Sequence, residues 1–79
     1  MRVRVRLFAM LRHYLPDVPV GGYAERDLPE GATVSDLLAS LGVPETEARV
    51  VFVNGRARPP DWRLQPGDEV GIFPPIGGG

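Results

Sequence analysis

Glycine and proline interrupt this chain so often that none of its secondary-structure elements can be long. Ten glycines and nine prolines are distributed among only 79 residues, and both residue types weaken or end helices and strands. The intervening runs leave room for one short helix or one strand each. A doubly wound fold, which alternates parallel strands with long crossover helices, is therefore excluded.

Size and composition limit the classes of function. The chain is 43% hydrophobic, enough for one small core. It has no cysteine, so disulfides, thiolate nucleophiles and cysteine metal sites are excluded. Its only histidine, His13, is expected to be an exposed helix residue, and no metal site is predicted. All nine basic residues are arginine and ten residues are acidic, so no attraction to nucleic acid is expected.

Targeting signals are also missing from the sequence. No run approaches the ~18 consecutive apolar residues of a membrane-spanning helix. The first residues alternate charged with apolar side chains, where a signal peptide would be continuously apolar. We therefore expect a cytoplasmic protein that does not contact a membrane.

The first 15 residues predict a strand followed by a short helix. Positions 1–8 alternate apolar residues with Arg2, Arg4 and Arg6, a period of two that gives one buried and one solvent-exposed face. The arginine row could contact phosphates, but the favoured interpretation is a solvated strand face that discourages edge pairing. Apolar residues at helical spacing then predict a short helix over 8–15: Phe8, Leu11 and Leu15, with Met10 and Tyr14 as further candidates.

The segment after residue 32 predicts the main helix. Thr33 stands at an N-cap position with Asp36 three residues later, the spacing of a capping box. Gly42 provides the C-terminal stop, and Pro44 prevents the helix from resuming. Between them, the residues at core-facing helical spacing are Val34, Leu37, Leu38 and Leu41.

The remaining patterns predict short strands joined by tight turns. The expected strands cover residues 23–28 (an edge strand), 50–53, 56–58 and 69–73. The uninterrupted Val50–Val53 run is typical of a central strand covered on both faces, and Asn54-Gly55 predicts a hairpin. Asp61–Leu64 is interpreted as one helical turn. With the two helices, this order predicts an α+β fold.

The C-terminus carries the strongest functional signal. Pro74-Pro75 fixes the direction in which the chain leaves the last strand. Gly77, Gly78 and Gly79 have no Cβ atoms, so they can enter a channel too narrow for other residues. Such a tail would deliver the Gly79 carboxylate, which a partner must activate. A frayed end or a cloning scar is the alternative. We predict a globular domain over 1–73 and a flexible glycine tail over 74–79.

The sequence resembles the MoaD/ThiS family of sulfur-carrier proteins over nearly its whole length. The most specific matches are Val53–Gly55 and the run Leu64–Gly78, in which a Gly-Asp-Glu-Val turn leads to a Phe-Pro-Pro strand end and terminal glycines. Leu7–Arg12 is similar to the first helix of the small subunit of molybdopterin synthase, which favours that branch of the family. The resemblance implies a ubiquitin-like β-grasp fold, with a mixed sheet of about five strands packed on one main helix.

The resemblance also implies a mechanism and partners. An E1-like enzyme (MoeB type) would consume ATP to adenylate the C-terminal glycine, and a sulfur donor would convert it to a thiocarboxylate. The tail would then enter the large subunit of molybdopterin synthase (MoaE type), in a complex expected to be a heterotetramer. The chain would bind no cofactor itself and would act as a carrier, a subunit of a sulfurtransferase complex rather than an enzyme alone.

The resemblance assigns roles to individual residues. Gly79, preceded by Gly78, would carry the adenylate and then the sulfur. The residues implied to contact partners are Phe8, Arg12, Phe73, Pro74, Pro75, Ile76 and Gly77. Core packing is the alternative role for both phenylalanines. The family usually ends in two glycines and this chain in three, so either Gly78 or Gly79 is the mature terminus. A third patch position, usually aliphatic, falls at Ala57 beside Arg58.

Three other functions stay open at this stage. Carriers for thiamine-thiazole or thio-amino-acid synthesis share the same tail chemistry. A ubiquitin-like protein modifier would join Gly79 to lysines of target proteins, and the absence of lysine here excludes only lysine-linked chains of the protein on itself. A plain interaction module would have an inert tail.

Overall fold

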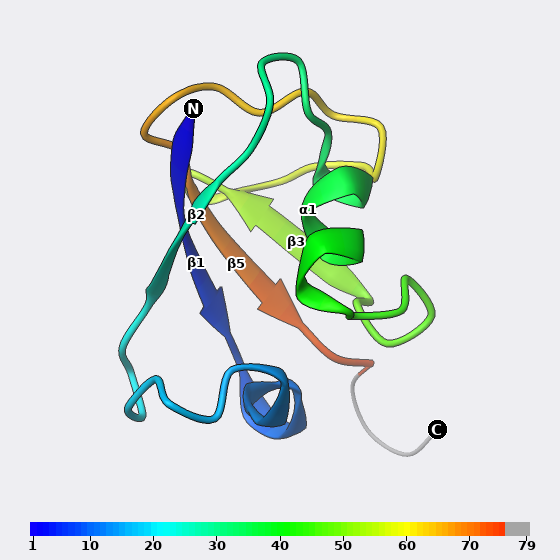
Figure 1. Cartoon of the computed structure of the whole chain (residues 1–79). Coiled ribbons are helices and arrows are strands. Elements are labelled where there is room, and N and C mark those ends of the chain that lie inside the picture. Colours follow the sequence, from blue (N-terminus) through cyan, green and yellow to red (C-terminus); the bar gives the residue numbers. More distant parts are fainter. Residues whose placement is uncertain (76–79) are drawn as a thin grey trace.

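A five-stranded mixed sheet with one α-helix across one face forms the domain (Figure 1). The computed structural model of the chain describes residues 1–75. In chain order the elements are β1 (Arg2–Leu7), the 3-10 helix η1 (Ala9–Tyr14), β2 (Ala24–Asp27), α1 (Val34–Leu41), β3 (Val50–Val53), β4 (Arg56–Ala57) and β5 (Glu69–Phe73). The predicted α+β class and β-grasp architecture are confirmed, with the short first helix as a 3-10 helix.

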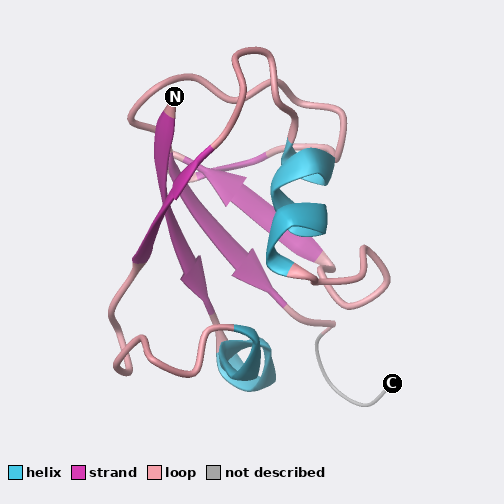
Figure 2. Ribbon diagram, in the orientation of Figure 1, coloured by secondary structure: helices cyan, strands magenta, loops and turns pink. Residues whose placement is uncertain are grey.

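The sheet order is β2-β1-β5-β3-β4, with the first and last strands of the chain side by side at its centre. β1 and β5 run parallel, with Val5 opposite Val70, whereas the other pairs are antiparallel. η1 packs at the ends of β1 and β5, beyond the main helix (Figure 2). Because β5 is central, the chain leaves the domain from the middle of the sheet.

The core lies between α1 and the sheet. Strand residues at alternate positions are buried against the helix, as the period of two predicts. The buried strand residues are Val3, Val5, Leu7, Val51, Val53, Val70 and Ile72. The four apolar residues predicted for the core-facing side of the helix are all buried against these strands, and they are Val34, Leu37, Leu38 and Leu41. Within residues 1–75, no helix has the length and apolarity to cross a membrane.

The ends of α1 follow the sequence prediction. Thr33 accepts a hydrogen bond from the Asp36 backbone N–H, and the Asp36 carboxylate accepts one from the Thr33 N–H at 2.9 Å, completing the capping box. Gly42 has a φ of 76°, the left-handed conformation of a helix stop.

A side-chain network joins the hairpin turn to the start of β5. The Asn54 amide donates to Asp68 Oδ1 at 2.8 Å and accepts from the Glu69 backbone N–H at 2.9 Å. The Gln65 N–H donates to Asp68 Oδ2 at 2.7 Å, so both oxygens of this buried carboxylate are bonded. Asn54 itself has a φ of 52°. The two sequence motifs that carry the family resemblance most specifically, Val53–Gly55 and Leu64–Gly78, therefore meet in one hydrogen-bond network.

The predicted helical turn over Asp61–Leu64 is wrong. The Trp62 N–H donates to the Pro59 carbonyl in a turn, and Arg63 then forms a β-bridge with Thr33. The carbonyls of Trp62 and Pro60 accept from the N–H groups of Val34 and Ser35, at 3.0 and 2.8 Å. The segment stays extended because its carbonyls satisfy the first donors of α1, which have no partner within the helix.

Three other expectations are corrected by the topology. β3 is covered on one face only, since Val50 and Phe52 stay half-buried on the other. The arginine row lies on an exposed face, but β1 is a central strand and has no edge to protect. Met10, placed among the apolar positions of the first helix, is 68% exposed, because the tight 3-10 turn buries only Leu11.

Candidate docking site

Three phenylalanines gather on the sheet face that α1 leaves uncovered. Phe8 stacks on Phe73 with ring centroids 4.1 Å apart and planes 4° from parallel, and Phe52 meets Phe73 edge-on at 5.5 Å. All three rings are half-buried, whereas the residues of the core are aliphatic. The role of Phe8 and Phe73 is therefore not packing in the main core, and they form an aromatic cluster (Phe8, Phe52 and Phe73) on the opposite face.

Strand register brings these distant residues together. Phe73 lies opposite Val50 in the antiparallel pair of β5 and β3, which places Phe52 opposite Gly71. Phe8 follows β1, which runs parallel to β5, and its N–H donates to the Ile72 carbonyl at 3.1 Å. This bond continues the β1–β5 ladder by one residue, so the Phe8 ring reaches the ring of Phe73.

Gly71 keeps the space beside the cluster open. A Cβ atom at this position would lie 3.2 Å from Phe8 Cε2 and 3.7 Å from Phe73 Cε1. The glycine lines a groove of about 670 Å³ on the open face, together with the three phenylalanines and Tyr23. That volume is in the range of binding pockets, whose walls are mainly apolar and aromatic. A side chain at Gly71 would fill the groove or displace Phe8.

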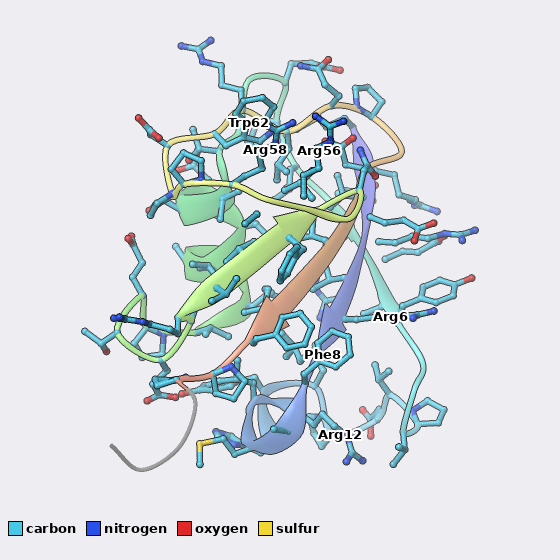
Figure 3. All side chains as sticks on the ribbon, turned by 180° about the vertical axis from the view of Figure 1, so that it is seen from behind. Arg6, Phe8, Arg12, Arg56, Arg58 and Trp62 are labelled. Atoms are coloured by element: carbon cyan, nitrogen blue, oxygen red, sulfur yellow. The ribbon has the colours of Figure 1, made fainter. Side chains whose placement is uncertain are left out.

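Cationic side chains form one wall of this groove. The Arg4 guanidinium lies 4.6 Å from the centroid of the Tyr23 ring and 4.0 Å from the Glu69 carboxylate. Arg6, on the same face of β1, also lines the groove and extends away from the sheet (Figure 3). The groove thus combines aromatic rings with two arginines and one glutamate. It suits a partner segment with an apolar side chain next to an acidic one.

The outer part of the open face carries ion pairs. Arg2 contacts Asp27 at 3.1 Å and Glu25 at 3.3 Å. The hydrogen bond from Arg2, reinforced by its charge, lowers the pKa of Asp27 below the ordinary value. The same bond raises the pKa of Arg2. Because these side chains are largely exposed, the pairs contribute little to stability.

The residues predicted to contact partners fall into three groups. Phe8 and Phe73 are in the aromatic cluster, and half-buried Pro74 and exposed Pro75 continue directly from it. Arg12 is exposed on η1 (Figure 3) and does not line the groove. Ile76 and the glycines 77–79 lie outside the described residues, so the prediction of a flexible tail and the roles of Gly78 and Gly79 stay predictions.

Sequence reasoning missed several residues of this site. Phe52 was assigned only to a strand, although strand alternation places it opposite the face of Val51 and Val53. Gly71 and Tyr23 had no signal of their own, because their roles depend on register between strands. Ala57, which the resemblance places in the patch, lies opposite Phe52 in the β3–β4 pair and is exposed.

The described residues hold no obvious catalytic or metal centre. In residues 1–75, no group of three or more histidine, cysteine, aspartate or glutamate side chains could hold a metal ion. His13 is exposed, as predicted, with Nδ1 2.6 Å from the Met10 carbonyl. The Glu47 carboxylate accepts a 2.7 Å hydrogen bond from Tyr14, which raises the pKa of that phenol.

Comparison with known proteins identifies a family that the chain matches over nearly its whole length. The sequence model of the Mut7-C ubiquitin family matches residues 1–77. Comparison with curated protein sequences gives no significant match.

Solved structures cover the chain almost completely. SAMP1 from Haloferax volcanii is 28% identical with a TM-score of 0.74, and the match covers 100% of both chains. A Pyrococcus furiosus protein assigned as molybdopterin converting factor, subunit 1, is 31% identical over 96% of this chain and 99% of its own, with a TM-score of 0.73. The HVO 2177 protein of Haloferax volcanii is 27% identical with a TM-score of 0.79, covering 100% of this chain and 87% of its own.

These matches confirm the resemblance drawn from the sequence motifs. The relatives are small ubiquitin-like proteins, and the match to the Pyrococcus furiosus protein spans both the sheet and the main helix. The chain therefore belongs to the Mut7-C ubiquitin family and is a ubiquitin-like protein of the MoaD/ThiS sulfur-carrier type.

Proposed function

We propose that this protein carries sulfur on its C-terminal glycine for molybdopterin synthesis. The observation that carries the proposal is the aromatic cluster at the point where β5 ends, from which Pro74-Pro75 leads directly toward the terminal glycines. A partner docked on this cluster would receive the tail in a fixed direction.

The chemistry requires activation by a partner. In the first step the Gly79 carboxylate attacks the α-phosphate of ATP on an E1-like enzyme (MoeB type), forming an acyl-adenylate and releasing pyrophosphate. In the second step a sulfide-equivalent donor attacks the acyl carbon, a C–S bond forms, and AMP leaves. The product is a thiocarboxylate. No acid or base in the described residues is placed for these steps, so the partners would supply them.

Docking offsets the entropy lost when the tail is ordered. Fixing three glycines costs a few kcal/mol, at ~1–2 kcal/mol per residue. Half-exposed aromatic rings provide large apolar contacts with little loss of side-chain freedom, and such residues dominate binding energy at interfaces. Phe8, Phe52 and Phe73 are suited to this role because stacking already holds their rings in place.

The assignment to molybdopterin synthesis rests on the likeness to the Pyrococcus furiosus protein and on the short helix after β1. In this proposal the thiocarboxylate tail enters the large subunit of molybdopterin synthase (MoaE type) within a heterotetramer. Sulfur transfer for thiazole or thio-amino-acid synthesis is the nearest alternative, since it uses the same tail.

A second candidate function is protein modification. The likeness to small archaeal modifier protein 1 of Haloferax volcanii favours it. In that case the acyl-adenylate would lead to an amide bond between Gly79 and a lysine of a target protein. Both functions begin with the same adenylation, so the experiment must follow the fate of the tail.

Intact-mass spectrometry tests the proposal. The protein is incubated with the E1-like enzyme, ATP and a sulfide donor, and a mass gain equal to the exchange of one oxygen for sulfur is expected. A variant lacking Gly78 and Gly79 should show no gain in mass. Phe73→Ala should acquire sulfur more slowly than the wild type, because its tail is intact but its docking to the enzyme is weakened. An unchanged mass of the intact protein would contradict the proposal.

Two further measurements distinguish the alternatives. Binding of the large synthase subunit, and not a thiazole synthase, would support the molybdopterin assignment. Recovery of tagged protein in covalent, higher-mass species that resist thiol reagents would instead support protein modification. A variant lacking only Gly79 shows which glycine is the working terminus, because sulfur loading survives its loss only if Gly78 can serve.

A further inference from the structure

A second surface site lies at the other end of the sheet from Phe8. Figure 3 shows Arg56, Arg58 and Trp62 together there, far from η1 and from the end of β5. They line a pocket of about 250 Å³ with Gln65 and Asp68. The proposed sulfur-carrier function makes no use of these three side chains.

The pocket is built on a fixed backbone. The Arg58 N–H donates to the Val51 carbonyl at 2.9 Å, which continues the β3–β4 ladder past Ala57. Trp62 is held on both sides, since its N–H donates to Pro59 and its carbonyl accepts from the first turn of α1. Arg56 and Arg58 are two positions apart, so both project from the same side of this extended segment. A ligand here would meet groups that are already in place.

The guanidinium of Arg58 lies over the Trp62 ring, with Cζ 3.9 Å from the ring centroid. This cation–π contact holds the guanidinium against the ring, while Trp62 as a whole stays 37% exposed. An arginine supported in this way keeps a fixed fork of N–H donors, which matches the two oxygens of a carboxylate.

The charge of the pocket is not neutralised by the domain. Among residues 1–75, ion pairs involve only Arg2 and Arg4, and the buried Nε of Arg58 meets no acceptor. Asp68 is the one carboxylate in the pocket lining, and both of its oxygens accept hydrogen bonds from Asn54 and Gln65. Two arginines therefore line the pocket with a single carboxylate, which already accepts hydrogen bonds within the domain.

We propose that this pocket binds a carboxylate side chain in an acidic segment of a partner protein. Its volume is below the ~300–1,000 Å³ of small-molecule pockets and suits one side chain. Nucleic acid is disfavoured because the chain has a net charge of −1 and Arg58 covers a face of the indole on which a base would stack. β4 is an edge strand of the sheet, so an extended segment can approach along its free side.

This contact is independent of the proposed sulfur chemistry. It would give the protein a second point of attachment, at the β4 edge of the sheet. A partner with an acidic segment could then be recognised whether or not the tail is loaded.

Fluorescence tests the proposal directly, because Trp62 is the only tryptophan of the chain. The full-length protein is titrated with hexaglutamate, with hexaglutamine as the neutral control and with inorganic phosphate and a single-stranded oligonucleotide as separate arms. We expect a saturable change in Trp62 emission with hexaglutamate and with none of the other three probes. Added salt should weaken the affinity for hexaglutamate. Arg56→Gln and Arg58→Gln should each lower the affinity about tenfold, the equivalent of ~1.4 kcal/mol.

Arg49→Gln is the matched control, since it removes the same charge from an exposed arginine outside the pocket. Its affinity should stay at the wild-type value. Circular dichroism checks the fold of each variant. If Arg58→Gln does not fold, the affinity of Arg56→Gln for hexaglutamate decides whether the pocket binds a carboxylate. The NMR shift of the Trp62 indole N–H on addition of hexaglutamate to the unaltered protein then provides the second measurement. An unchanged emission with hexaglutamate, an equal loss in Arg49→Gln, or equal binding of phosphate or oligonucleotide would overturn the proposal.

Discussion

The two faces of the sheet use the same strands for different purposes. On the face covered by α1, the residues of β1, β3 and β5 are aliphatic and buried, as Val5, Val51 and Ile72 illustrate. On the open face, the same strands carry arginines and two of the three phenylalanines, and none of these side chains is fully buried. One face has completed its contacts within the domain, while the other retains apolar and charged surface for a partner.

This difference would let so small a domain be stable and, in the proposed function, still bind a partner. Burial of each aliphatic side chain of the covered face contributes ~1.5–3 kcal/mol. The aromatic cluster adds contacts of its own but keeps part of its area exposed, and exposed apolar patches commonly mark interaction sites. Substitutions on the covered face should therefore affect folding, whereas those on the open face should affect docking.

The largest expected effect is on the covered face. Leu37→Ala removes a fully buried side chain from α1 and leaves a cavity, so we expect a loss of ~2–5 kcal/mol in the free energy of unfolding. Phe52→Ala, on the open face, should cost less, because its ring is only half-buried. Urea denaturation measures both. An equal loss in the two variants would contradict the distinction between the faces.

The next effect concerns the network that ties the two motifs together. Asn54→Ala removes two hydrogen bonds, leaves one oxygen of buried Asp68 without its donor, and places alanine at a φ of 52°. We expect a loss of ~1–3 kcal/mol in unfolding experiments. Asn54→Gly is the control, since glycine accepts this φ and isolates the contribution of the side chain. If Asn54→Gly matches the wild type, the network does not stabilise the fold.

A third prediction uses Gly71 to alter docking without altering the core. In Gly71→Val the new side chain should displace the Phe8 ring, since even a Cβ atom would lie 3.2 Å from it. Sulfur loading by the E1-like enzyme should become about tenfold less efficient, while the unfolding midpoint changes little. Glu30→Gln, a change at an exposed residue outside the groove, is the control. Normal loading in Gly71→Val would show that the cluster is not the docking surface.

The smallest effect is at the exposed ion pair of the open face. Because Arg2 lowers the pKa of Asp27, the ionised carboxylate stabilises the folded state above its ordinary pKa, and this contribution is lost as pH falls through the lowered value. Wild type should therefore be slightly more stable than Asp27→Asn at neutral pH, and the difference should vanish in acid. Thermal unfolding from neutral to acid pH measures it, with Glu30→Gln as the control. If the difference in stability between wild type and Asp27→Asn persists or grows in acid, it has a cause other than the ion pair.

The sequence by itself determined the elements whose contacts are local. The capping box of Thr33 and Asp36, the Gly42 stop and the Asn54-Gly55 turn depend on residues within a few positions of one another, and all were predicted correctly. The alternation in β1 also predicted which side chains would be buried. The terminal glycines also have a role assigned from the sequence, and because they lie outside residues 1–75 that role stays a prediction.

Tertiary structure decided everything that depends on register between distant strands. The parallel pairing of β1 with β5 made the arginine row part of a central strand and brought Phe8 onto Phe73. The N-terminal donors of α1 kept the chain around Trp62 extended where a helical turn was expected, and so formed the pocket with Arg58. These contacts join residues far apart in the chain, and no local pattern of polarity encodes which strand will pair with which.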